Sequence, residues 1–377
     1  MTAIVTTAEV LPAEDTAAPF TPVGLVIVGY GRWGANHARA ASAAHGIALQ
    51  GVVDPRPSAR DAAQQSCGVP AFASLEQALN DRGIEAVVIA TPAATHTEVV
   101  REALHSGRHV LVEKPAAMSL AEARAIAAEA DSRGVQLSAG HTFLYTQPVR
   151  NLARWLREAA PSRPWLVRSE RLGGQRREDC DVLWNFGPHD VSILLHLLAE
   201  PVAEVTARGH RFPGGRHLDG VTLDLGFASG VRGEVYLGWR HPGAKRSLRL
   251  LGEDWAIKYR HGHLDGEDTL TRSGPQGPRQ IDDLLAEGCQ QSPRGGLHGY
   301  REPLKAELEE FALACRSGKP TVTGPEHLVA VTSVLEAAAR SAELGGRMLT
   351  PEPARRPRSA RSASAAFEPA GQTEQRH

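Results

Sequence analysis

Cysteine is scarce in this chain of 377 residues, which has four: Cys67, Cys180, Cys289 and Cys315. None belongs to a C-x-x-C pair and no histidine stands at zinc-finger spacing from them, so the pattern argues against a disulfide framework and a metal site. Isolated thiols of this kind are typical of a reducing cytosol, and we expect a cytoplasmic protein. No activating base is adjacent to Cys180 in the sequence, so we do not expect a catalytic thiol there.

An excess of basic charge is also missing, because 42 Lys and Arg residues are balanced by 43 Asp and Glu residues. A nucleic-acid partner is therefore not expected. No run reaches the roughly 20 apolar residues that a membrane-spanning helix requires, and the N-terminal stretch lacks the basic and apolar regions of a signal peptide. We expect no membrane partner, and we expect residues 1–22 and the Pro-, Ser- and Arg-rich residues 351–377 to be disordered tails.

Short apolar runs alternate with amphipathic stretches between residues 23 and 145. The runs are too short and too uniformly apolar for half-exposed antiparallel strands, so each is expected to be a buried strand. Strand alternating with helix predicts an α/β domain with a doubly wound parallel sheet. The five expected strands cover residues 24–31, 48–54, 86–91, 109–114 and 135–140.

The pattern changes after a helix candidate at residues 148–160, and alternating strands then follow one another directly. Glycine-containing turns join them, which predicts an α+β C-terminal domain with an open mixed β-sheet over residues 146–350. The Gly- and Pro-rich residues 273–298 are expected to form a loop, followed by two closing helices at residues 301–318 and 325–344. The six expected strands cover residues 165–172, 202–212, 220–228, 231–239, 247–253 and 255–261.

A complete G-x-G-x-x-G motif follows the first predicted strand and opens a predicted helix, which is the context that dinucleotide binding requires. Gly29 permits a tight turn, Gly31 lets the backbone approach a pyrophosphate, and Gly34 lets helix and strand pack closely. The N-terminus of the helix, which includes Arg32 and Trp33, offers free N–H groups to the phosphates.

Asp54 ends the second predicted strand, at the distance from the glycines where an acid binds the adenosine ribose. A carboxylate at this position repels a 2′-phosphate, so NAD is favoured over NADP. Arg56, two residues further on, could accommodate that phosphate, and NADP stays possible.

The sequence Glu113-Lys114-Pro115 stands directly after a buried strand, and similar agreement extends to residues 90–96, 140–145 and 335–347. These segments together resemble the Gfo/Idh/MocA family, the glucose–fructose oxidoreductase and inositol dehydrogenase superfamily, over residues 23–350. The resemblance implies a Rossmann domain, a second domain whose open sheet mediates homodimers or homotetramers, and chemistry in the cleft between them. It places Lys114 beside the nicotinamide and the reacting hydroxyl, with Thr91, Pro92, His96 and Glu113 in the cofactor site.

A second family motif corresponds to residues 184–190. His189 is expected to act as acid or base, on the first turn of a helix capped by Gly187 and begun by Pro188. The family usually has an aspartate where this chain has Asn185, an amide that can hydrogen-bond a substrate hydroxyl but cannot hold a negative charge.

Further side chains complete the expected site. Tyr145 could line a sugar pocket or belong to the core, and His96 could contact the cofactor or cap a helix. Asn185, Arg171 and Trp184 are expected on the substrate side.

The sequence therefore predicts an NAD(P)-dependent oxidoreductase that moves a hydride between nicotinamide and a ring hydroxyl or ketone of a sugar, cyclitol or nucleotide sugar. The dehydrogenase direction is favoured. One alternative is an NADPH-dependent ketoreductase of deoxysugar or natural-product biosynthesis. Another is a non-catalytic dinucleotide-binding sensor or scaffold.

Overall fold

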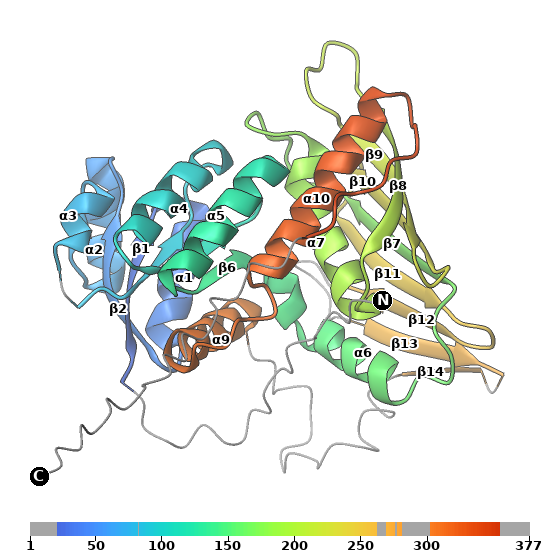
Figure 1. Cartoon of the computed structure of the whole chain (residues 1–377), viewed down its shortest axis with the longest axis horizontal. Coiled ribbons are helices and arrows are strands. Elements are labelled where there is room, and N and C mark those ends of the chain that lie inside the picture. The colour runs from blue at the N-terminus through green and yellow to red at the C-terminus, as the bar shows by residue number, and fades with distance from the viewer. Residues whose placement is uncertain (1–20, 82, 262–268, 276, 281–301, 355–377) are drawn as a thin grey trace, which may run out of the picture.

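Two sheets standing side by side organise the molecule (Figure 1). The computed structural model describes residues 21–81, 83–261, 269–275, 277–280 and 302–354. The predicted tails therefore lie almost wholly outside the described residues.

The first sheet is entirely parallel, with the order β3-β2-β1-β4-β5-β6, and it confirms the doubly wound Rossmann prediction. All five predicted strands are present, and the short third strand is an addition. The strands are β1 (Val23–Val28), β2 (Ile47–Val53), β3 (Ala71–Phe72), β4 (Ala86–Ile89), β5 (His109–Glu113) and β6 (Leu137–Gly140).

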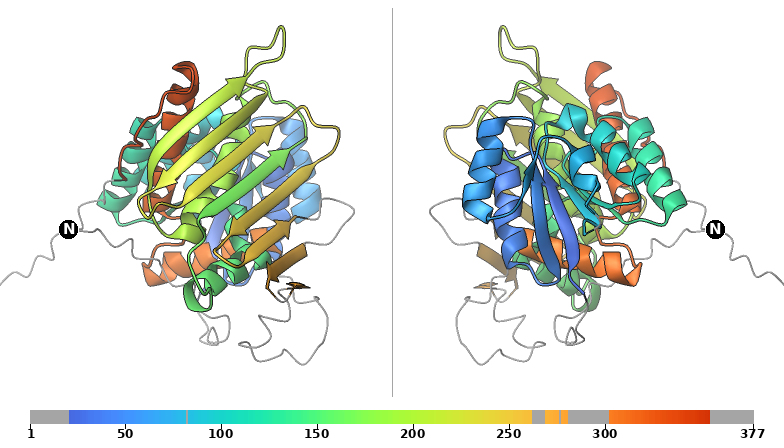
Figure 2. Two further views of the ribbon diagram at one scale, coloured as in Figure 1. Left: turned by 90° about the vertical axis from the view of Figure 1, so that its right-hand side faces the viewer. Right: turned by 90° about the vertical axis from the view of Figure 1, so that its left-hand side faces the viewer.

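Helices cover both faces of this sheet, as the right-hand view of Figure 2 shows. Ser74 and Ser119 cap two of them, by accepting hydrogen bonds from the backbone N–H groups of Gln77 and Glu122. This is the hydroxyl capping that favours a helix start. The helices are α1 (Arg32–Ala43), α2 (Pro57–Cys67), α3 (Leu75–Leu79), α4 (His96–His105) and α5 (Leu120–Arg133), with short 3-10 turns η1 (Ala93–Thr95) and η2 (Thr142–Tyr145).

The second sheet is mixed, with the order β14-β13-β12-β11-β7-β10-β9-β8. Strands β7 and β10 pair in parallel and the other neighbours pair antiparallel, which confirms the open mixed sheet. The strands are β7 (Leu166–Leu172), β8 (Val202–His210), β9 (Gly220–Phe227), β10 (Arg232–Gly238), β11 (Lys245–Leu251), β12 (Ala256–Arg260), β13 (Thr269–Gly274) and β14 (Gly277–Gln280).

The prediction of a loop over residues 273–298 is wrong at its start. Residues 277–280 form β14, which pairs with β13, and Gly274 lies opposite Gly277. Gly277 has a φ of +88°, a conformation that glycine adopts readily, so it allows this reversal of the chain. Residues 281–298 lie outside the described residues.

Four further helices complete the fold in the described ranges: α6 (Gln147–Glu158), α7 (Val182–Leu198), α9 (Pro303–Ser317) and α10 (Pro325–Glu343). Helix α7 packs against the inner face of the second sheet, and α10 contacts both α7 and α5. Helix α9 returns to the Rossmann sheet, where Leu308 and Phe311 share a core with Leu25. The predicted domain boundary at residue 145 stays a prediction. Residues of α9, near the C-terminal end of the described chain, complete the core of the Rossmann domain.

The predicted start of the helix that carries His189 is wrong. Helix α7 begins at Val182, because the Asp181 side chain caps it by accepting the Trp184 N–H at 3.1 Å. Pro188 therefore lies inside the helix, where it lacks the N–H that an interior residue normally donates.

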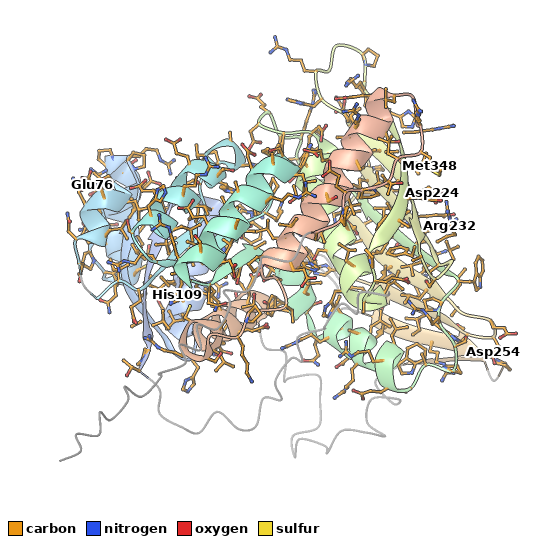
Figure 3. The ribbon with its side chains drawn as sticks, in the orientation of Figure 1. Glu76, His109, Asp224, Arg232, Asp254 and Met348 are labelled. Atoms are coloured by element: carbon orange, nitrogen blue, oxygen red, sulfur yellow. The ribbon has the colours of Figure 1, made fainter. Side chains whose placement is uncertain are left out.

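No helix covers the outer face of the second sheet in the described part of the chain (Figure 2, left). Charged side chains pair across neighbouring strands there, as in the contact between Arg232 and Asp224 at 2.7 Å and the pair of Arg168 with Glu234. Figure 3 shows Arg232 and Asp224 on this side, pointing away from the body of the molecule.

Candidate active site

The glycine turn has the geometry that a bound pyrophosphate requires. Gly29 has a φ of +91°, and a side chain on it would meet the Ala90 carbonyl oxygen at 2.8 Å. A Cβ on Gly34 would lie 1.8 Å from the Gly29 carbonyl oxygen, so this residue must be glycine for α1 to pack on β1. A Cβ on Gly31, in contrast, would have no atom within 4 Å. The open space at Gly31, beside the uncapped N-terminus of α1, fits a dinucleotide phosphate.

Asp54 is held in its ionised form at the end of β2. Its Oδ2 accepts the Tyr30 backbone N–H at 2.8 Å, and its Oδ1 accepts the Arg56 backbone N–H at 2.9 Å. The Arg56 guanidinium adds an ion pair at 2.9 Å. Burial acts to raise the pKa of Asp54, but these hydrogen bonds and the arginine charge outweigh it and lower the pKa to about 2.

A cleft of about 1000 Å³ runs from this turn to the junction with the second domain. Nearly all predicted cofactor residues line it, and Asn185 of α7 closes its far end. Gly34 is the exception, since it packs beneath the turn. The predicted residues that line the cleft are Gly29, Gly31, Arg32, Trp33, Asp54, Thr91, Pro92, His96, Glu113, Lys114 and Asn185.

Lys114 lies where the two domains meet. Its Nζ donates to the backbone oxygen of Asn185 at 3.0 Å and lies 3.4 Å from the Asn185 Oδ1. Burial lowers the pKa of Lys114 to about 8, although Glu113 partly opposes the shift. Both neutral and charged forms of this amine are therefore populated near neutral pH.

Glu113 and His96 fix the backbone around Lys114. The Glu113 Oε1 lies 2.8 Å from the Nε2 of His37, a buried residue on α1. Burial acts to raise the pKa of Glu113, and the hydrogen bond with His37 outweighs it, so the pKa is lowered. The ring nitrogens of His96 lie 2.8 Å from the Pro115 carbonyl oxygen and 2.9 Å from that of Thr91, which ties two walls of the cleft together.

His189 lies in the second turn of α7. Its ring packs edge-to-face on Phe143 with a centroid distance of 4.8 Å, and its buried Nδ1 has no hydrogen-bond partner in the described part of the chain. Burial, followed by the positive charges of Lys114 and Arg171, lowers the pKa of His189 well below its ordinary value. The imidazole is therefore neutral at physiological pH.

The remaining predicted substrate residues lie away from the cleft lining. Arg171 is buried on β7 and bonded to Asp190 at 2.5 Å. Trp184 packs against the core of the second domain. Tyr145 is buried in the same core with 2% exposure, and its hydroxyl lies 3.4 Å from the Thr323 Oγ1. Of the two roles expected for Tyr145, the structure favours that of a core residue over that of a sugar-pocket residue.

Both domain models of one family match the chain. The model described as "Oxidoreductase family, NAD-binding Rossmann fold" matches residues 23–141, and the Gfo/Idh/MocA C-terminal domain model matches residues 149–258. The chain belongs to the Gfo/Idh/MocA oxidoreductase family. Its cofactor is a nicotinamide dinucleotide, and its chemistry is that of an oxidoreductase acting on CH–OH groups.

Individual relatives in this family differ in substrate. The chain is 28% identical to a 1,5-anhydro-D-fructose reductase of Ensifer adhaerens, over 67% of this chain and 76% of that protein. It is 34% identical to a UDP-N-acetylglucosamine 3-dehydrogenase of Acidithiobacillus ferrooxidans, over 47% of this chain and 55% of that protein. A crystal structure of an oxidoreductase from Agrobacterium radiobacter, in complex with NAD+, L-tartaric acid and magnesium, shares the fold. It has a TM-score of 0.75 and 21% identity, and covers 88% of this chain and 98% of that one.

Sequence reasoning missed several members of the Gfo/Idh/MocA cleft. Arg177 and Asp179 line it from the loop before α7, where no motif marked them. Cys180, whose place shortly before the His189 motif indicates a position near a site, lines the cleft from the same loop. Burial raises the pKa of Cys180 to about 11, so this thiol is protonated near neutral pH. His37 lies one helical turn after Gly34, and that spacing was the one signal that could have placed it beneath the cofactor turn.

Two features are absent from the described residues. No group of three or more His, Cys, Asp or Glu side chains is arranged to hold a metal ion there. Within the same ranges, none of the helices combines the length and the apolar character needed to cross a bilayer.

Proposed function

We propose that this chain is an NAD-dependent dehydrogenase that oxidises a ring hydroxyl of a sugar, cyclitol or nucleotide sugar. The observation that carries the proposal is the position of Lys114. Its amine, with a pKa lowered to about 8, is bonded to Asn185 at the far end of the cleft that begins at the glycine turn. A base of this strength beside a cofactor cleft suits the removal of a hydroxyl proton.

The residues of this chain divide the chemistry as follows. Gly29, Gly31 and the N-terminus of α1 would hold the pyrophosphate of NAD, which supplies the hydride acceptor when bound, and Asp54 would bind the adenosine ribose. Neutral Lys114 accepts the hydroxyl proton and then returns it to solvent. Asn185 orients the amine through the contact between its backbone oxygen and Nζ.

The role that we assign to His189 differs from the acid or base role that the sequence suggested. Its strongly lowered pKa makes it a weak proton acceptor, because acceptance would place another charge beside Lys114 and Arg171. We assign it the role of orienting the substrate hydroxyl, and we assign the proton transfer to Lys114.

A reductase working with NADPH is the second candidate, and the ion pair of Arg56 with Asp54 favours it. This pair neutralises the carboxylate that would repel a 2′-phosphate. The Arg56 side chain is 62% exposed and can turn toward such a phosphate. One relative is named as a reductase and another as a dehydrogenase, so both directions occur among similar proteins.

We also propose a homodimer or homotetramer formed through the outer face of the second sheet, and a cytoplasmic location. The uncovered, continuous strand surface supports the assembly. The non-catalytic alternative is disfavoured because Lys114 and Asn185 retain a bonded arrangement that a scaffold would not require.

Substitution of Lys114 by alanine tests the proposed function. For any sugar that the wild-type enzyme oxidises, we expect turnover to fall by about 10²–10⁴-fold, the usual contribution of a positioned acid or base. NAD affinity, measured by titration, should stay within a few-fold, because the glycine turn and Asp54 are unchanged. Lys319→Ala, at an exposed position, is the matched control. A Lys114→Ala enzyme that keeps its activity would place the chemistry elsewhere.

A further inference from the structure

Two arginines lie directly opposite each other on the inner face of the second sheet. Arg246 of β11 is the cross-strand partner of Arg171 of β7. Like charges in directly opposed positions destabilise a strand pair, so this arrangement calls for compensation. The inner face is the one covered by α7, whose Asp190 contacts Arg171.

Among the described residues, the carboxylate of Asp190 contacts only one of these two arginines. Its Oδ2 accepts from Arg171 at 2.5 Å and its Oδ1 accepts from the Ser169 hydroxyl at 2.5 Å. The buried Nε of Arg246 has no hydrogen-bond partner among the residues that the structure describes. Burial and then the charge of Arg171 lower the pKa of Arg246 to about 10, which leaves it charged at neutral pH. Within the part of the chain that the structure describes, the cluster of Arg171, Arg246 and Asp190 therefore carries one positive charge in excess.

Phe143 connects this cluster with the active site. Its ring packs under the Arg171 guanidinium at 4.4 Å and against the His189 ring at 4.8 Å. The positive charges of Arg171 and Lys114 both act on His189 and lower its pKa. The ring of Phe143 thus separates the Arg171 guanidinium from His189, the residue that we assign to orient the substrate hydroxyl, and the charge of Arg246 also acts on that imidazole.

We infer that Arg246, with Arg171 behind it, binds a carboxylate carried by the substrate, so that the substrate is a sugar acid. This inference rests on the proposed function and names its substrate class. A carboxylate fits because it carries the single negative charge that the cluster lacks and because its planar oxygens match a guanidinium.

The test is calorimetric titration of the NADH-loaded full chain with matched acid and neutral probes. The probes are D-glucuronate against D-glucose, and UDP-glucuronate against UDP-glucose. We expect at least one acid to bind roughly tenfold or more tightly than its neutral partner, as a charge-assisted hydrogen bond provides. Arg246→Gln should remove that preference. Arg249→Gln, on the same strand but exposed on the outer face, should keep it.

Equal binding of acid and neutral partners, or a preference unchanged in Arg246→Gln, would overturn the inference. Should Arg246→Gln fail to fold, Arg246→Lys, which retains the charge, must keep the acid preference for the inference to stand. Turnover measured on the same probes separates the two proposals. Acid binding that depends on Arg246 without any oxidation or reduction supports the anion site and contradicts the dehydrogenase. Turnover of a neutral sugar without a preference for the acid supports the dehydrogenase and contradicts the anion site.

Discussion

Lys114 depends on neighbours that come from distant parts of the sequence. Asn185 contacts its amine from α7, and His37 holds the adjacent Glu113 from α1. Each contact restricts a side chain that would otherwise be free, which is how an active site reaches a productive geometry. Burial is the largest cause of the lowered pKa of Lys114, and the charges of Arg177 and Arg171 lower it further.

The pH dependence of oxidation should report that pKa. Lysine accepts a proton only when it is neutral, so kcat/KM should rise about tenfold per pH unit at low pH. The curve should level off above about pH 8, the value to which burial lowers the lysine pKa. Stopped assays in constant-ionic-strength buffers measure the profile. In Lys114→Arg the rise should disappear with the activity, because arginine stays protonated. A wild-type profile that is flat through this range would remove Lys114 as the base.

At the scale of elements, the N-cap of α7 determines where His189 lies in that helix. Because Asp181 starts the helix, His189 lies in its second turn, on the side that faces Phe143. A start at Pro188 would have left the helix shorter and Asn185 in an irregular segment. The placement of Asn185 beside Lys114 therefore rests on a cap four residues before it.

Removal of this cap gives an element-scale prediction. Asp181→Ala should lower the free energy of unfolding by about 1 kcal/mol, the usual cost of losing a side-chain N-cap. Urea denaturation followed by circular dichroism measures it. Asp181→Asn keeps an oxygen acceptor and serves as the control. Equal stability of the Ala and Asn variants would mean that the hydrogen bond to Trp184 does not hold the start of the helix.

The strands and helices of the first domain could be predicted because apolar runs and serine caps are local signals. The start of α7 could not, since proline is common at a first helical position and the earlier aspartate competed with it. The contact of His37 with Glu113 spans 76 positions and requires the parallel sheet to be assembled first. The Arg171 and Arg246 pair likewise depends on strand register, which turn residues alone do not reveal.

At the scale of the whole molecule, the two domains are joined by more than the chain between them. Helix α9 completes the core of the Rossmann sheet, and α10 packs against helices of both domains. The two domains that border the cleft are therefore also connected by the packing of α9 and α10. No helix of the described residues covers the outer sheet face (Figure 2).

The proposed homodimer or homotetramer leads to a prediction about that face. Light scattering should give the mass of two or four chains, and Tyr236→Arg should shift the protein toward one chain. Tyr236 is 44% exposed on β10, and a new arginine there would place an additional positive charge in each copy of the proposed symmetric interface. Glu76→Arg, at the opposite end of the molecule in Figure 3, is the control that should leave the mass unchanged. A single-chain mass for the wild type would contradict the proposed assembly.

The most direct test of the central claim is a nicotinamide absorbance assay. The purified full chain would be incubated with free sugars, inositols, sugar acids and nucleotide sugars, with NAD+ and NADP+ in separate reactions. The account predicts reduction of NAD+ in preference to NADP+ with one class of ring hydroxyl. Absence of reduction across the panel, while NAD+ still binds by titration, would contradict the proposed dehydrogenase.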